Sequence, residues 1–289
     1  SAASGFSLPL CVASVMGGAM FGDNLSFISD TTIAACQGQG CQMKDKFREN
    51  FKIALPAALV TLVIILVLSL GTDISGTVQN DYNLLELIPY LIVLVGGIVG
   101  INVFIVLLLG ILSGSIIVVA EGAVAATDLL GNMGTGAAGM FETTMVAVLV
   151  SAICALIREN GGFVALLNGI KRLFRSRKGG QLGMGLLVGA MDIATANNTV
   201  AIVMANPIAH EMAETYNVSR RKTASILDTF SCVFQGVIPY GAQMLMAAGI
   251  SQVSPLLVMK YLYYPLILGI CSTLAIALAP GGTERRRKR

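Results

Sequence analysis

Residues 21–32 read Phe-Gly-Asp-Asn-Leu-Ser-Phe-Ile-Ser-Asp-Thr-Thr, a cluster of acids and hydroxyls inside an apolar chain. Hydrophobic residues make up 55% of the 289 positions and charged residues 12%, whereas soluble domains carry roughly 25% charged residues. The charges are too few to cover a surface that faces water, so the solvent of most of this chain is lipid. We therefore expect an all-α polytopic membrane protein with a transmembrane helix broken at residues 21–32.

Further apolar segments follow this break. Residues 53–71 form an apolar run long enough to cross about 30 Å of hydrocarbon, and a re-entrant hairpin is expected at 181–210, where the polar tip Asp192–Thr199 interrupts an apolar segment. Residues 121–140 are expected to be a Gly-rich loop with a short interfacial helix, and 161–178 a basic amphipathic surface helix. The other expected spans are 84–100 and 102–120 (or one tilted helix over both), 141–157, 224–249 with an interruption at 235–241, and 255–279.

Basic residues fall into four clusters, each beside an apolar span. Cytoplasmic loops collect Lys and Arg, so the clusters predict a multi-pass protein of the plasma (inner) membrane with a cytoplasmic C-terminus. Nucleic-acid binding is not expected from clusters placed in this way. Tyr261, Tyr263 and Tyr264 fit an aromatic interface belt with Lys260 beside them, and no basic residue is predicted at the midplane. The clusters are Lys44/Lys46/Arg48/Lys52, residues 171–178, Arg220/Arg221/Lys222 and Arg285–Arg289.

A second stretch repeats the order of elements seen at the first break. Residues 227–240 again place an Asp, Asp228, in an apolar helix interrupted by Ser, Gly and Pro, and a full crossing follows. Five predicted membrane crossings separate the two breaks. Because this number is odd, the second copy has the opposite orientation in the membrane to the first. Inverted repeats hold their ion sites near the midplane, where broken helices face each other. We assign residues 1–289 to one transporter domain, with 1–71 as the end of the first repeat, 84–279 as the second and 280–289 as a basic cytoplasmic tail.

The carboxylates at these breaks are the candidate ion ligands. Burying an acid in a membrane is costly, so such residues mark functional sites by default. Desolvation raises a carboxyl pKa and a bound cation lowers it, so one carboxylate holds a proton or Na⁺ in competition. We predict Na⁺ at Asp23, Asp30 and Asp228, with Asp192 and Glu142 as secondary candidates. The other predicted ligands are Asn24, Ser26, Ser29, Thr31, Thr32, Asn197, Asn198, Thr199, Pro239 and Tyr240.

Structural explanations remain open for four of these five acids. Asp30 can be a helix N-cap, Asp228 can pair with Arg220 or Arg221 at the membrane surface, and Glu142 can be an interfacial acid at a helix N-terminus. Asp192 can equally be a helix-end acid in water.

These motifs resemble those of the NhaC-type sodium/proton antiporter family, part of the ion transporter superfamily. Residues 21–32 are similar to its FGDxxSPxSDTT motif, with Phe27 in place of Pro. The other similar segments are Gly139–Met145 with Ala155–Gly162, and Ser219-Arg220, Asp228 and Val237–Tyr240 in its LSR…ED…LIPW region, with Tyr240 in place of Trp. The resemblance implies Na⁺/H⁺ exchange and about four further helices before Ser1.

The leading hypothesis is Na⁺/H⁺ antiport, with Na⁺ and H⁺ as transported ions and no cofactor. The alternative is a Na⁺- or H⁺-coupled carrier of a small organic acid or amino acid, since the tip Asn197–Thr199 looks like the hairpin tips of the superfamily's carboxylate carriers. An enzyme is not expected, because no Asp/His/Ser constellation lies at membrane depth. The expected partners are the lipid bilayer and the transported cations, and a homodimer is left open.

Overall fold

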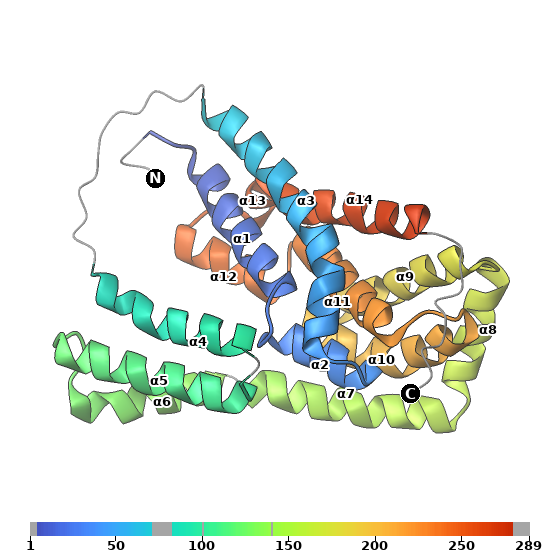
Figure 1. The fold of residues 1–289 in the computed structure, drawn as a ribbon, viewed down its shortest axis with the longest axis horizontal. Helices are drawn as coiled ribbons and strands as arrows, with labels where there is room; N and C mark the ends of the chain where they lie inside the picture. Colours follow the sequence, from blue (N-terminus) through green and yellow to red (C-terminus); the bar gives the residue numbers. More distant parts are fainter. Residues whose placement is uncertain (1–4, 71–82, 100, 140, 280–289) are drawn as a thin grey trace. The chain divides into compact units, whose positions relative to one another are not determined.

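Every regular element of the described residues is helical (Figure 1). The computed structural model describes residues 5–70, 83–99, 101–139 and 141–279, so the predicted tail 280–289 lies outside the described residues. The helices are α1 Leu8–Asn24, α2 Asp30–Gln39, α3 Met43–Ser69, η2 Leu84–Leu87, α4 Ile88–Val99, α5 Val103–Ala120, α6 Ala126–Gly139, α7 Phe141–Glu159, α8 Gly162–Leu173, α9 Arg177–Thr195, α10 Asn198–Thr215, α11 Arg220–Val237, α12 Ala242–Ser251, α13 Pro255–Tyr261 and α14 Tyr263–Leu278. The predicted all-α class is confirmed.

The chain divides into two compact units. One comprises Ser1–Thr77 with Val150–Arg289, and the other Val78–Leu149. In the second unit α4 and α5 pack against each other, with Val106 of α5 seated against Gly96 of α4. The chain turns between them, and the side chain of Asn102 accepts a hydrogen bond from Phe104 N at the start of α5. Two short helices are therefore present, as the two-span prediction required. The stretch 121–140, predicted to be mostly loop, instead forms α6 over fourteen of its residues.

The three predicted interruptions are all present in the first unit. The first separates α1 from α2, and Ser29 caps α2 by accepting a hydrogen bond from Thr32 N. The cap of α2 is thus Ser29 and not Asp30, which corrects the capping alternative. Between α9 and α10, Ala196 adopts a left-handed conformation with φ 53°, and Asn197 caps α10 through Val200 N. Between α11 and α12 the chain leaves the helix at Ile238.

One described helix, α3, is by itself long and apolar enough to cross a membrane. The pair α13 and α14, bent by 51°, makes a second candidate if it is counted as one span. The segment predicted as the span 255–279 therefore bends at Leu262. The C-terminal half of α3 exposes large apolar side chains, among them Leu62, Val63 and Leu66. A surface of that kind suits lipid or other apolar protein better than water. Helix α3 also begins ten residues before the predicted span, at Met43.

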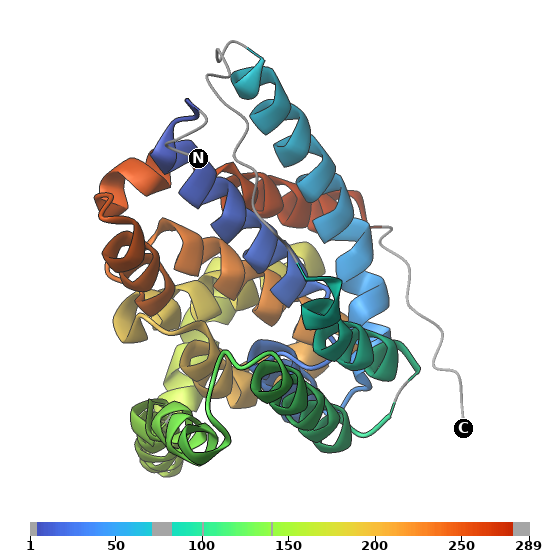
Figure 2. The same ribbon diagram turned by 90° about the vertical axis from the view of Figure 1, so that its left-hand side faces the viewer.

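Helices α9, α10 and α11 form the first of two cores in this unit. The α9–α10 hairpin packs on itself and on α11 (Figure 1 and Figure 2). The approach of α9 to α11 is close because glycines face aromatic rings: a Cβ on Gly189 would lie 2.2 Å from Phe234, and one on Gly185 2.6 Å from Phe230.

The second core lies among α1, α3, α13 and α14. It contains Tyr264, which is 1% exposed. Its hydroxyl contacts Asn24 Nδ2 at 3.2 Å. The interface-belt prediction is therefore wrong for this tyrosine, because its ring fills the space beside the first helix break.

We expect Gly189→Ala to lower the free energy of unfolding by about 1–3 kcal/mol, since the added methyl overpacks the contact with Phe234. Gly249→Ala is the matched control, because its Cβ meets nothing within 4 Å on α12; it should be neutral or stabilising by about 0.5–1 kcal/mol. Unfolding of the detergent-solubilised protein followed by circular dichroism measures both. Equal midpoints for the two variants would contradict the close α9–α11 packing.

Candidate functional site

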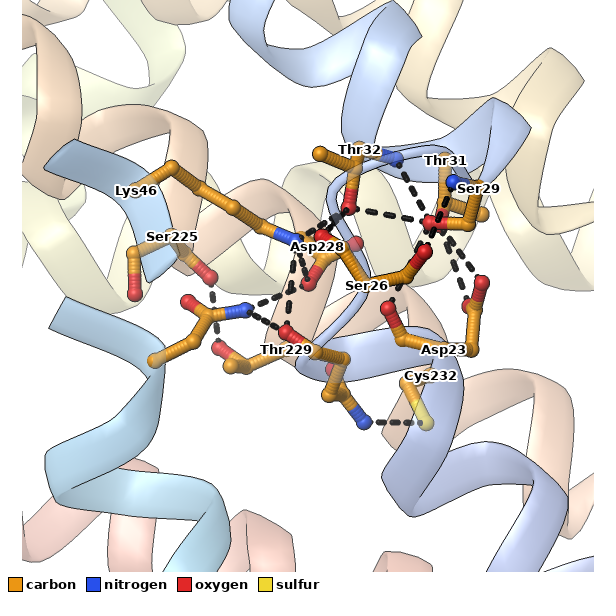
Figure 3. Close-up of polar contacts among 12 residues, drawn as sticks. Asp23, Ser26, Ser29, Thr31, Thr32, Lys46, Ser225, Asp228, Thr229 and Cys232 are labelled. Carbon is orange, nitrogen blue, oxygen red and sulfur yellow. Dashed lines mark hydrogen bonds and ion pairs between the residues drawn. The ribbon is translucent and has the colours of Figure 1, made fainter. Parts of the chain in front are cut away.

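A buried ion pair lies between α3 and α11. Lys46 Nζ is 2.7 Å from Asp228 Oδ2, and the two side chains are 0% and 1% exposed. Lys46 stands in the first turn of α3 and Asp228 in the middle of α11, so the pair joins two helices far apart in the sequence. Figure 3 shows the two side chains pointing toward each other.

The first helix break completes the surroundings of this pair. Lys46 also donates to Thr32 Oγ1 at 2.6 Å, and Asn50 donates to Asp228 Oδ2 at 2.6 Å. Asn50 further donates to the carbonyl oxygen of Asn24 at 2.8 Å. That carbonyl is free because α1 ends there: Ile28 N, which would bond to it in a continued helix, bonds to Ser26 Oγ instead. The break therefore supplies an acceptor that an intact helix would consume.

Lys46 and Asn50 are functional candidates that the sequence analysis missed. Lys46 was counted with a basic cluster outside the apolar spans, whereas its side chain is fully buried in the protein. The proposed pairing of Asp228 with Arg220 or Arg221 is also wrong, because Arg220 pairs with Glu214 and Arg221 with Glu49. A usable signal was present: the buried positions of α3 are Lys46, Asn50, Ala54, Ala57 and Thr61, one helical face of small and polar residues.

Asp23 lies at the other end of a chain of hydroxyls. Both of its carboxylate oxygens accept from Thr31 Oγ1, at 3.1 and 3.0 Å. Thr31 Oγ1 is 3.1 Å from Ser29 Oγ, which is 2.9 Å from Thr32 Oγ1, and Thr32 is bonded to Lys46. Figure 3 shows this path from Asp23 to the ion pair.

Asp23 also lines a cavity of about 720 Å³. The walls are mostly apolar residues of α1 and α12, among them Val12, Met16 and Ile250, and Asn198 and Cys232 lie in the lining with Asp23. The hydroxyl path therefore links an open cavity to the closed ion pair.

The tip of the α9–α10 hairpin meets the first break through Asp30. Thr199 Oγ1 donates to Asp30 Oδ2 at 2.7 Å. Asp30 is exposed, unlike Asp228. The predicted residues thus fall into two neighbouring groups: Asp23, Asn24, Ser26, Ser29, Thr31, Thr32 and Asp228 around the ion pair, and Asp30, Asn197, Asn198 and Thr199 at the tip.

The remaining candidates lie elsewhere. Tyr240 is 49% exposed and donates to the backbone oxygen of Ile193 at 2.9 Å. It therefore holds the break between α11 and α12 against α9, and Pro239 precedes it in this break. Asp192 is fully buried, which rules out the reading of this residue as a helix-end acid in water. The side chain of Glu142 lies outside the described residues.

Comparison with known proteins finds one family. The sequence model of the Na⁺/H⁺ antiporter family matches residues 83–282. No curated protein and no solved structure matches the chain. The matched region covers more than half of the chain and includes Asp228, Asp192 and the hairpin tip, whereas Lys46 and Asp23 precede it.

We expect Lys46→Met to destabilise the protein by about 3–5 kcal/mol, because it leaves the Asp228 carboxylate buried without its cation. The double variant Lys46→Met/Asp228→Asn should recover part of this loss, since an amide at 228 is neutral and still accepts from Asn50. Glu214→Gln, at an exposed pair, should cost at most about 1 kcal/mol. Thermal unfolding in detergent tests the series, and a double variant no more stable than Lys46→Met would contradict the pairing.

Proposed function

Because the chain belongs to the Na⁺/H⁺ antiporter family, we propose that it exchanges Na⁺ for protons at the Lys46–Asp228 pair. The family is one of cation/proton antiporters, which makes this chain part of a membrane transporter and not of an enzyme. The observation that carries the proposal is the buried ion pair, connected by hydroxyls to the cavity beside Asp23. We further propose the inverted-repeat arrangement and a plasma-membrane location with the C-terminus in the cytoplasm.

Na⁺ and the Lys46 ammonium compete for the same carboxylate in this mechanism. Both are monovalent cations, and Asp228 has one unpaired buried oxygen, Oδ1. Na⁺ prefers oxygen ligands, and the break supplies the Thr32 hydroxyl and the Asn24 carbonyl beside the ion pair, with the Asp23 carboxylate at the other end of the hydroxyl path. A Na⁺ ion that binds Asp228 takes the place of the ammonium group.

The displaced lysine then provides the proton. An ammonium group left in the interior without a partner carries a large desolvation cost, and loss of a proton removes it. The hydroxyls of Thr32, Ser29 and Thr31 both donate and accept, so by reorienting they pass the proton toward Asp23 and the cavity. One Na⁺ bound thus releases one proton from Lys46, and the reverse sequence restores the ion pair.

The organic-acid alternative receives no support from the buried lysine. A carboxylate substrate needs a positive group that is not already neutralised, and Asp228 neutralises Lys46 at 2.7 Å. No other Lys or Arg side chain among the described residues is buried. The geometry therefore favours cation exchange.

We expect Lys46→Arg to abolish exchange in proteoliposomes of the full-length protein. Arginine keeps the positive charge but does not release a proton in proteins, so the ion pair remains and the cycle stops. Asp228→Asn should also be inactive, whereas Asp128→Asn, at an exposed acid of α6, should match the wild type. The measurement is the dissipation of an imposed pH gradient by a sodium pulse, with insertion checked separately. Wild-type rates for Lys46→Arg would show that Lys46 does not carry the proton.

A second variant tests the hydroxyl path. Thr31→Val keeps the side-chain shape but removes the hydroxyl that bonds to Asp23, and we expect exchange to slow by about fivefold, the equivalent of one hydrogen bond of ~1 kcal/mol. Thr127→Val, at an exposed threonine of α6, is the control. Initial rates at saturating Na⁺ make the comparison, and equal rates for the two variants would exclude Thr31 from the proton path.

A further inference from the structure

Asp192 and Asp228 are the buried acids among the described residues, and of the two only Asp228 pairs with a cation. Asp192 lies on α9, one turn before the hairpin tip, and is 0% exposed. Neither carboxylate oxygen has a hydrogen-bond partner of good geometry among the described residues, although the backbone amide of Gln235 lies nearby. By contrast, Asp228 is held by Lys46 and Asn50, and Asp23 by Thr31.

Among the described residues, no Lys or Arg of the helices packed against α9 forms an ion pair with Asp192, and those of α8 stand in its last turn. On α11 the basic residues stand in the first turn and the buried Cys232 lies further along the helix, one turn after Asp228. The first three turns of α10 hold no ionisable side chain, and α14 contributes two tyrosines and one cysteine. The described ion pairs involve none of the oxygens of Asp192.

An acceptor for a proton on Asp192 lies at the same end of the hairpin. Gln235 Oε1 is buried and has no donor. The amide nitrogen of this side chain points to the carbonyl oxygen of Ala196 at 3.4 Å, and Ala196 N is bonded to the carbonyl of Asp192 at 2.7 Å. A protonated carboxyl donates as well as accepts a hydrogen bond, so it can donate to Gln235 Oε1. An ionised carboxylate only accepts, and it would join two acceptors already present, Gln235 Oε1 and the Ala196 carbonyl.

We propose that Asp192 is a second proton-binding site of the exchanger, distinct from the Lys46–Asp228 pair. An ionised carboxylate buried without a partner costs far more than a neutral one, so the group carries a proton in this conformation. The proton leaves Asp192 Oδ for water while the hairpin tip is open to one side of the membrane, and a proton is taken up from water on the opposite side before the tip is buried again. This role rests on the proposed exchange, and it adds one proton to the one released by Lys46 for each Na⁺ moved.

Infrared spectroscopy of the reconstituted full-length protein tests the protonation state directly. A protonated carboxylic acid gives a carbonyl stretching band that shifts in D₂O. We expect Asp192→Asn to lose one such band at neutral pH and Asp192→Glu to keep one at a shifted frequency, while Asp128→Asn leaves the spectrum unchanged. An identical acid band in the wild type and Asp192→Asn would overturn the proposal. If Asp192→Asn does not fold, the absence of a shifted band between the wild type and Asp192→Glu overturns it equally.

A measurement of the transport ratio distinguishes this inference from the proposed function. The number of protons moved per Na⁺, obtained from the reversal of exchange under opposed gradients, should fall by one in Asp192→Asn and stay at the wild-type value in Asp128→Asn. An unchanged ratio in Asp192→Asn would contradict the second proton. If the wild type exchanges no Na⁺ and Asp192→Asn still lacks the acid band, the antiport mechanism is overturned. The protonated state of Asp192 would then stand by itself.

Discussion

The Lys46–Asp228 pair constrains much of the first unit, because two opposite charges buried in an apolar protein have to meet with good geometry. Helix α3 must begin early enough to place Lys46 against α11. Helix α1 must end at Asn24 so that its carbonyl accepts from Asn50, and α2 must start so that Thr32 meets the ammonium group. A buried pair is often no more stable than well-packed apolar residues. Its presence is therefore better explained by what it does than by the stability it contributes.

The helix breaks were predictable from the sequence because their causes are local. Ser29 and Asn197 cap the helices that follow them, and such side chains compete with the helical backbone wherever they occur. The two short helices around Asn102 follow from the same chemistry. These features depend on a few neighbouring residues, so a single sequence contains the information.

The partners across the breaks were not predictable in the same way. Lys46 has the composition and position of an ordinary cytoplasmic lysine, and a rule that counts basic residues treats it like Lys44. Only the packing of α3 on α11 and α1 places its side chain inside, at 0% exposure. Tyr264 was misplaced for the same reason, since a tyrosine near a span end suits both an interface belt and a buried contact with Asn24. Burial is decided by distant segments, which sequence patterns along one helix do not describe.

Three aspartates of one unit illustrate why a buried lysine suits an exchanger under the proposed mechanism. Asp228 is neutralised by a cation, Asp23 is bonded to a hydroxyl beside a cavity, and Asp192 has neither a cation nor a side-chain donor among the described residues. A lone carboxylate between ions would leave a bare charge inside the protein, and moving it through the membrane would be costly. With Lys46 in place, the negative charge of Asp228 is balanced by Na⁺ when the ion is bound and by the Lys46 ammonium when it is absent. The state with neither cation is the costly one, so the site changes sides only when it is occupied, and this couples the movement of Na⁺ to that of the proton.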